Sequence, residues 1–248
     1  MIRLSTFFVL LLLTITFTVH AIDETESIRQ RSQNKPNFTN LSIDLSGKKG
    51  NSETENVELG IYHSERFEQH FGYIMATREY SKSNGQKNAD NSFIHIRYNY
   101  YISDNEAVEV FAQTNVDDFK SLESRKLIGL AYRQEVNSTS SFGVGIFNEH
   151  EEYLVNNETL SFIQNRMNVY WVVSKKLNEL VTLSNTIYYQ PNIESLNDWR
   201  AYNKLSISSK LTDNISMKFG LQVEHDSKPV LNVEATDVSY QAGFEIEF

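Results

Sequence analysis

The chain has 248 residues, of which 40% are hydrophobic and 22% charged, and this composition excludes a disordered protein. It contains no cysteine, which excludes disulfides and thiolate metal sites, and its formal net charge of −9 argues against nucleic acid as a partner. Aromatic residues make up 12% and there are only three prolines, a composition that favours β-strands.

The first 21 residues have the pattern of a cleavable signal peptide. Arg3 supplies the positive charge, residues 4–17 form an apolar run, and Ala21 ends a stretch suited to cleavage. The run is short for a membrane-spanning helix, which is the alternative reading. Cleavage would leave 22 Lys and Arg against 32 Asp and Glu, a net charge of −10. We therefore expect an exported chain that begins near Ile22.

Residues 22–37 are polar and of mixed charge, and they end at Pro36 and Asn37, so we expect a flexible lead-in there. From Phe38 to the end, the apolar residues recur with period two, which is typical of strands. No later stretch is apolar enough to cross a bilayer as a helix, so any span must be β. We expect twelve strands, around 41–45, 57–61, 71–75, 94–100, 108–112, 128–132, 142–146, 163–173, 181–189, 205–211, 215–223 and 238–248.

The last strand shows the alternation most clearly. Its even positions from Val238 to Phe248 are apolar or aromatic, whereas Gln241, Glu245 and Glu247 lie among the odd ones. Such a strand has one face toward an apolar medium and the other toward water. Short connections, such as residues 103–106 and 212–214, alternate with longer ones, such as 81–91, 151–159 and 226–236. The pattern predicts an all-β, antiparallel up-and-down transmembrane β-barrel over residues 38–248.

The same alternation predicts which charged side chains face the lumen. The expected lumen-lining residues are Arg97, Arg133, Arg166, Arg200, Lys204, Lys218, Glu58, Glu109 and Glu224, together with Asp44, Glu245 and Glu247. These side chains either line a conducting pore or pair with one another and fill a narrow barrel. The near balance of the two signs favours pairing.

Catalytic and metal-binding patterns are weak. His95 and His225 are assigned to the lumen by parity, and His150, beside Glu149 and Glu151, is the best remaining candidate for catalysis at a lipid boundary. No G-x-S-x-G motif accompanies it, so a solvated loop histidine is the favoured interpretation. HExxH and EF-hand spacings are absent, and we expect no catalytic, cofactor or metal site.

The C-terminal part resembles one bacterial family of outer-membrane proteins of unknown function, whose members are identified as putative salt-induced outer-membrane proteins. The matching segments are 188–191 (Tyr-Tyr-Gln-Pro), 198–200 (Asp-Trp-Arg), 225–229, 236–237, 50–51 and the terminal Phe248. Trp199 and His225 depart from the family, in which tyrosine is common at both positions. The resemblance implies a barrel and an outer-membrane location, but no established activity.

The sequence therefore predicts an integral protein of a Gram-negative outer membrane, with a structural or surface-interactive role and a largely plugged, charge-paired lumen. A narrow solute or ion pore, an outer-membrane lipid-modifying hydrolase and a soluble periplasmic lipid carrier remain as alternatives. We expect contact with outer-membrane lipid and lipopolysaccharide, no nucleic acid as a partner, and no enzymatic activity. An aromatic residue at the end of the last strand, Phe248, resembles the signal read by the barrel assembly machinery.

Overall fold

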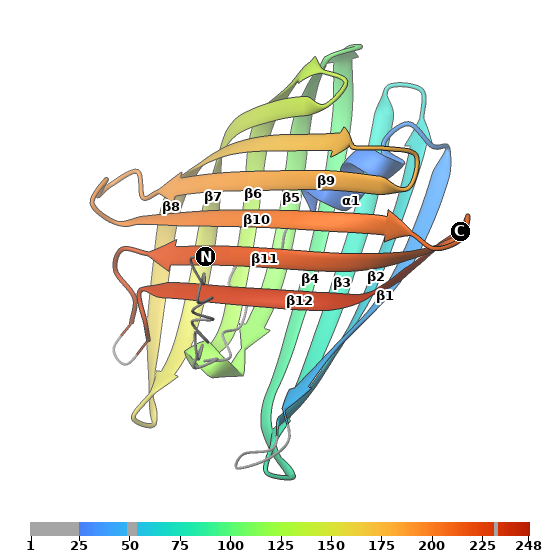
Figure 1. Cartoon of the computed structure of the whole chain (residues 1–248). Coiled ribbons are helices and arrows are strands. Elements are labelled where there is room, and N and C mark those ends of the chain that lie inside the picture. The colour runs from blue at the N-terminus through green and yellow to red at the C-terminus, as the bar shows by residue number, and fades with distance from the viewer. Residues whose placement is uncertain (1–24, 49–53, 231–232) are drawn as a thin grey trace, which may run out of the picture.

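The structure, a computed structural model, describes residues 25–48, 54–230 and 233–248. In these ranges twelve strands form one closed barrel, in which each strand pairs antiparallel with its sequence neighbours and β1 pairs with β12 (Figure 1). The predicted all-β, up-and-down barrel of twelve strands is confirmed. The predicted signal peptide, residues 1–21, lies outside the described residues. The strands are β1 (Asn37–Lys48), β2 (Thr54–Phe67), β3 (His70–Ser83), β4 (Gln86–Ser103), β5 (Glu106–Asp117), β6 (Leu122–Asn137), β7 (Ser140–Val155), β8 (Glu158–Lys176), β9 (Val181–Pro191), β10 (Trp199–Lys210), β11 (Ile215–Asp226) and β12 (Thr236–Glu247).

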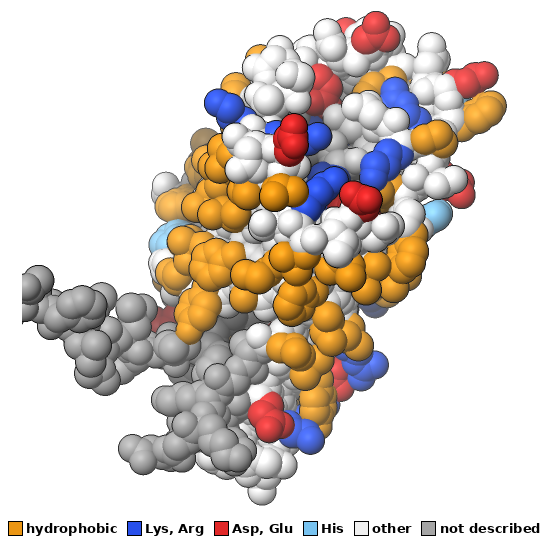
Figure 2. Space-filling view, turned by 45° about the vertical axis from the view of Figure 1, so that its right-hand side comes forward, with side chains coloured by type: hydrophobic (Ala, Val, Ile, Leu, Met, Phe, Trp, Pro, Cys, Tyr) orange, Lys and Arg blue, Asp and Glu red, His pale blue; other side chains and the backbone are white. Residues whose placement is uncertain are grey.

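Apolar side chains cover the outside of the barrel. Leu221 on β11 and Tyr240 on β12 are paired across the sheet and both are exposed, whereas their neighbours Gln222 and Gln241 point inward. The same alternation recurs around the wall, and Figure 2 shows a belt of hydrophobic side chains across the molecule. An apolar exterior with a polar interior is the reverse of a lipid carrier, so that alternative is wrong.

The two ends of the barrel differ in their connections. At one end, here called the turn end, β1 begins, β12 ends and short turns join β2 to β3, β4 to β5 and β6 to β7. At the other, the loop end, the short helix η1 (Asp118–Lys120) joins β5 to β6, and residues 227–235 join β11 to β12.

Two connections at the loop end are shorter than the sequence predicts. The expected loops 81–91 and 151–159 are instead extensions of the strands, joined by Asn84-Gly85 and Asn156-Asn157. All four turn residues have positive φ, which two-residue hairpin turns of type I′ require and which Asn and Gly adopt most readily. The extensions have polar outward residues such as Asn148 and Glu152, so they carry no apolar alternation to reveal them.

The helix α1 (Glu26–Ser32) lies inside the barrel, near the end where the C-terminus is found (Figure 1). Ser32 Oγ lies 2.8 Å from the hydroxyl of Tyr62 on β2, and Thr25 Oγ1 lies 2.8 Å from the hydroxyl of Tyr73 on β3. Ile28 packs in a cluster with Phe38 and aromatic residues of the wall. Residues 26–32 of the expected flexible lead-in, 22–37, therefore form a largely buried helix. No helix among the described residues is long and apolar enough to cross a membrane.

A glycine on the inner wall makes room for one of the largest buried rings. The ring of Tyr170 on β8 lies directly against Gly143 on β7, where any Cβ atom would collide with it. Tyr170 is 1% exposed and lies in the half of the lumen toward the turn end. Small residues on one strand therefore let aromatic rings of the next lie flat against the wall.

The facing of β11 generates a stability prediction. Leu221→Arg should lower the free energy of unfolding by about 2–4 kcal/mol if the side chain lies near the bilayer midplane, because a guanidinium would meet lipid. Gln241→Arg, a half-buried inward position on the adjacent strand, should cost much less. Urea unfolding in lipid vesicles measures both values, and equal losses would contradict the assigned facing.

Candidate functional site: the charge-paired lumen

The predicted lumen-lining residues all lie on inward faces of the strands, but they differ in burial. Arg97, Arg133, Arg166, Arg200, Glu109 and Glu224 are nearly fully buried. Glu58, Lys204 and Lys218 are half-buried and line a cavity together with Ser27 and Ile28 of α1. Asp44 and Glu245 are buried, and Glu247 is half-buried at the turn end.

The first group of paired charges, the helix cluster, joins α1 to the wall. Glu26 of α1 accepts hydrogen bonds from Arg97 on β4 and Arg133 on β6, both with N–O distances of 2.6 Å. Arg29 of α1 lies 3.3 Å from the same carboxylate and 3.0 Å from that of Glu109 on β5. All five side chains are at most 3% exposed, so little water competes with these pairs.

Neutral donors and acceptors complete the helix cluster. The hydroxyl of Tyr170 donates to Glu109 at 2.9 Å, and Arg29 donates to the side-chain oxygen of Asn99 at 2.9 Å. Arg133 also lies 2.7 Å from Glu135, which brings the carboxylates to three for three guanidinium groups. Charges in such a dry site are tolerated because nearly every one has an opposite partner.

The second group, the loop-end cluster, crosses the barrel from β6–β8 to β10. The carboxylate of Glu149 on β7 lies 2.7 Å from Arg125 on β6 and 2.6 Å from Arg166 on β8. Arg200 on β10 makes a bidentate contact with Glu151, at 2.8 and 2.9 Å. Asp198 and Asp226 complete this cluster, at 2.8 Å from Arg166 and Arg200 respectively. Arg–carboxylate forks of this kind fix geometry as well as charge.

An aromatic layer lies between the two clusters. His95 is 3% exposed and stacks between Phe93 and Phe111, with ring centroids 6.1 and 6.2 Å apart. The guanidinium of Arg97 lies 5.1 Å from the centroid of the Phe111 ring, a distance that permits a cation–π contact. His95 therefore lies in the lumen as predicted, packed among rings.

A third group of charges is more open. Arg31 of α1 lies 2.8 Å from Glu245 and 2.7 Å from Glu247, both on β12. Lys218 on β11 lies 3.5 Å from Asp44 on β1 and 3.7 Å from Glu245. The Lys218 distances are longer than those in the two buried clusters, and Arg31 and Lys218 are about one-fifth exposed.

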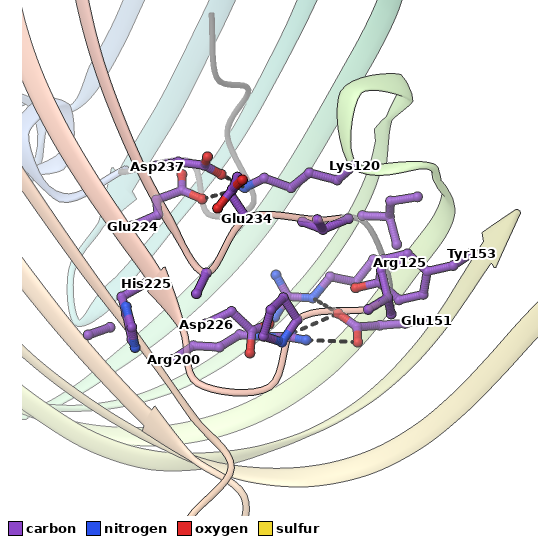
Figure 3. Close-up of a pocket in the computed structure, with 16 residues that line it drawn as sticks. Lys120, Arg125, Glu151, Tyr153, Arg200, Glu224, His225, Asp226, Glu234 and Asp237 are labelled. Atoms are coloured by element: carbon purple, nitrogen blue, oxygen red, sulfur yellow. Dashed lines mark hydrogen bonds and ion pairs between the residues drawn. The ribbon is translucent and has the colours of Figure 1, made fainter. Parts of the chain in front are cut away.

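A lysine from a loop reaches across the loop end. Lys120 of η1 lies 2.8 Å from Glu224 on β11 and 3.2 Å from Asp237 on β12, below the connection between these strands (Figure 3). Burial alone would lower the pKa of Lys120, but Glu224 and Asp117 outweigh burial and hold that pKa well above its usual range. Lys120 therefore remains charged and ties the β5–β6 connection to the opposite wall.

Sequence reasoning missed several members of these clusters. Arg125, Glu149 and Glu151 share the inward parity of Arg133 and Phe147, but they lie where the outward apolar signal has already ended. Extending each strand by parity alone through the polar segments would have found them. Glu26 and Arg29 carry no such signal, because α1 is short and has no apolar periodicity.

The two other histidines weighed in the sequence, His225 and His150, form no catalytic arrangement with the described residues. His225 faces outward beside Trp199, with ring centroids 4.7 Å apart, so its assignment to the lumen is wrong. It has the parity of Leu221, which is exposed. His150 also faces outward; its Nε2 lies 2.8 Å from Ser161 Oγ and 3.9 Å from Glu152. In a catalytic triad the acid binds the other ring nitrogen. No group of three potential metal ligands occurs in the described ranges.

The bridge made by Lys120 can be tested by hydrogen exchange. Lys120→Met should speed amide exchange in η1 and in the described part of the β11–β12 connection, because the bridge across the loop end is lost. Lys87→Met is the matched control, since Lys87 is half exposed and pairs with Asp90 on its own strand. Equal exchange rates in wild type and Lys120→Met would show that the bridge does not hold the two connections together.

Comparisons with known proteins agree with the barrel. The NanC porin is 12% identical, with a TM-score of 0.52, over 84% of this chain and 98% of the porin. The translocator domain of the autotransporter NalP from Neisseria meningitidis is 8% identical, with a TM-score of 0.53, over 90% of this chain and 92% of the domain. Both likenesses concern the fold alone. No curated protein matches the sequence. Residues 41–248 match the model of one family, so the chain belongs to the family described as "Protein of unknown function, DUF481".

Proposed function

We propose that this protein is an integral outer-membrane barrel with a structural or surface-interactive role, whose lumen is plugged by α1 and by paired charges. One observation carries the proposal: the carboxylate of Glu26, fully buried, sits among Arg29, Arg97 and Arg133. Two of these arginines come from the wall, so the plug and the wall share one electrostatic cluster.

The size of the barrel supports this proposal. Barrels of eight strands are filled by side chains, whereas those of sixteen to eighteen strands hold open channels. Twelve strands fall between these limits, and here α1 and large inward side chains occupy the space. Arg133, Arg166, Tyr170 and Phe71 are each at most 1% exposed, as only a filled interior allows.

The outer surface supports contact with lipid. The exposed apolar belt would face the acyl chains, and Trp171 and Tyr189 on β8 and β9 have the aromatic character of a membrane interface. At the closing strand, the backbone of Phe248 exchanges hydrogen bonds with Thr39, at 2.9 and 3.2 Å, while its ring is exposed. An exposed terminal aromatic is therefore available to the barrel assembly machinery before closure.

A narrow ion pore is a second candidate function, favoured by one observation. Glu58 and Lys204 are inward but half-buried, unlike the arginines of the clusters, and they face a cavity beside α1. The plug therefore does not fill the lumen evenly. His150 does not support a hydrolase, since Glu152 and Ser161 approach the same nitrogen of its ring.

The plugged lumen predicts unequal costs for two charge reversals. Arg166→Glu should lower the free energy of unfolding by about 3–5 kcal/mol, because it places a carboxylate against the buried Glu149. Lys204→Glu, a half-buried inward position without an ion pair in the structure, should cost far less. Urea unfolding in lipid vesicles gives both values. Similar small losses at both sites would indicate a water-filled lumen and contradict the plug.

The plug also predicts how vesicles respond to sugar. Proteoliposomes that contain the mature wild-type protein should not swell in isotonic arabinose, because α1 and the clusters leave no passage for a sugar. Deletion of residues 22–35 removes α1 and should allow swelling. Glu65→Gln, at a largely exposed position, serves as the control. Swelling of the wild-type vesicles at the rate of an open porin would refute the proposal.

A further inference from the structure

The inner wall has two unequal halves. On β3–β8 the inward side chains are large and buried, as at Tyr73, Arg97, Phe111 and Tyr170. On β1, β2 and β10–β12 large buried side chains such as Tyr62 and Tyr202 are interspersed with small or uncharged polar ones. The inward positions of this second half include Asn40, Ser42, Gly60, Ser206, Gly220, Ser239, Gln241 and Gly243. The lumen is therefore packed unevenly.

A cavity follows the small-residue half beside α1. It is bordered by Ser27 and Ile28 of the helix and by Ser42, Gln241 and the two lysines of β10 and β11, Lys204 and Lys218. Ser42, Gln241 and both lysines are half-buried, whereas inward residues of the packed half are nearly all below 10% exposed. Hydroxyl, amide and charged groups of this kind are hydrated when space allows.

Two charged residues in this half have no ion pair in the structure. Glu58 on β2 and Lys204 on β10 both border the cavity, yet neither lies within salt-bridge distance of an opposite charge in the described residues. Arg97, Arg133 and Arg166, by contrast, each contact at least one carboxylate at 2.6 Å. A charge that is buried without a partner is costly, so water is the partner that Glu58 and Lys204 retain.

We propose that a hydrated path for small inorganic ions runs beside α1, along the inner faces of β1, β2 and β10–β12. Glu58 and Lys204 lie on it as charges without a close ion pair and set its selectivity, as rings of charged side chains do in channels. The path rests on the proposed plug, since α1 forms one of its sides and excludes larger solutes. The Arg31 pairs with Glu245 and Glu247 border its turn end.

The chain contains no cysteine, so a single introduced thiol is the only one present. Its reaction with a small ion therefore tests directly whether that position is accessible. Ser42→Cys and Gln241→Cys place the thiol on the path, and Asn168→Cys in the packed half and Thr186→Cys on β9 are buried controls, 2% and 1% exposed. Silver ion, which is close to a potassium ion in size, is added to proteoliposomes. The path thiols should be lost to silver, with loss of potassium conductance in planar bilayers, while the control thiols stay free.

Reversal potentials test the role of Glu58 and Lys204. In a potassium chloride gradient, Lys204→Glu should shift the reversal potential toward cation selectivity, and Glu58→Lys should shift it toward anion selectivity. Lys126→Glu makes the same change in charge on the outer wall and should leave the potential where wild type has it. Equal shifts in Lys126→Glu and Lys204→Glu would show a surface effect and overturn the assigned path.

The results that would refute the ion path differ from those that would refute the plug. If wild type neither conducts potassium nor loses path thiols to silver, the path is wrong while the plug stands. If thiols of both halves react and wild-type vesicles swell in arabinose, the plug itself is wrong, and the path with it. Silver reaction at Ser42→Cys and Gln241→Cys alone, without swelling, supports both.

Discussion

The interior of this barrel depends on the carboxylate of Glu26. The wall alone places Arg97 and Arg133 in a dry region where Glu109 is fully buried and Glu135 is 16% exposed, so only one fully buried wall carboxylate faces the two arginines. Isolated charge is expensive in a medium of low dielectric, and α1 supplies the missing carboxylate. The helix also brings Arg29, which bonds back to Glu109, so each side of the cluster compensates the other. The short polar helix is held by these ion pairs together with the packing of Ile28 against the wall.

The same constraint shapes the loop end without a helix. Glu149 is fully buried and accepts from guanidinium groups on β6 and β8, and Arg200 approaches it from β10. Strands that are not neighbours in the sheet are thereby joined through the lumen. Between the two clusters the aromatic layer around His95 excludes water, which strengthens each pair. Barrel walls have only neighbour-to-neighbour hydrogen bonds, so these crossings resist flattening of the barrel in a way that the ladders cannot.

Sequence alternation predicts the wall well and the contents of the lumen only in part. The period of two in β11 and β12 comes from contact with lipid on one face, so it correctly assigns the facing of Leu221 and Lys218. That signal ends where the outside becomes polar, and for this reason the predicted strand 142–146 ends before Glu149, which lies on β7. Alternation cannot predict the helix α1, because the charged and aromatic wall residues that surround it are distant in sequence. Parity cannot specify which arginine pairs with which carboxylate, because some pairs, such as Arg200 with Glu151, join strands that are not neighbours in the sheet.

Insertion of α1 and closure of the barrel are linked at the seam between the first and last strands. β1 pairs with β12 over five residue pairs, compared with twelve between β1 and β2, so this is a weak part of the ladder. The helix contacts both sides of the seam: Arg31 bonds to Glu245 and Glu247 on β12, and Ser32 bonds to Tyr62 on β2. The small inward residues of this region leave room for the helix to reach both strands. A barrel with an open seam would lack one of these partners, so the seated helix favours the closed barrel, and the closed barrel in turn completes the site for the helix.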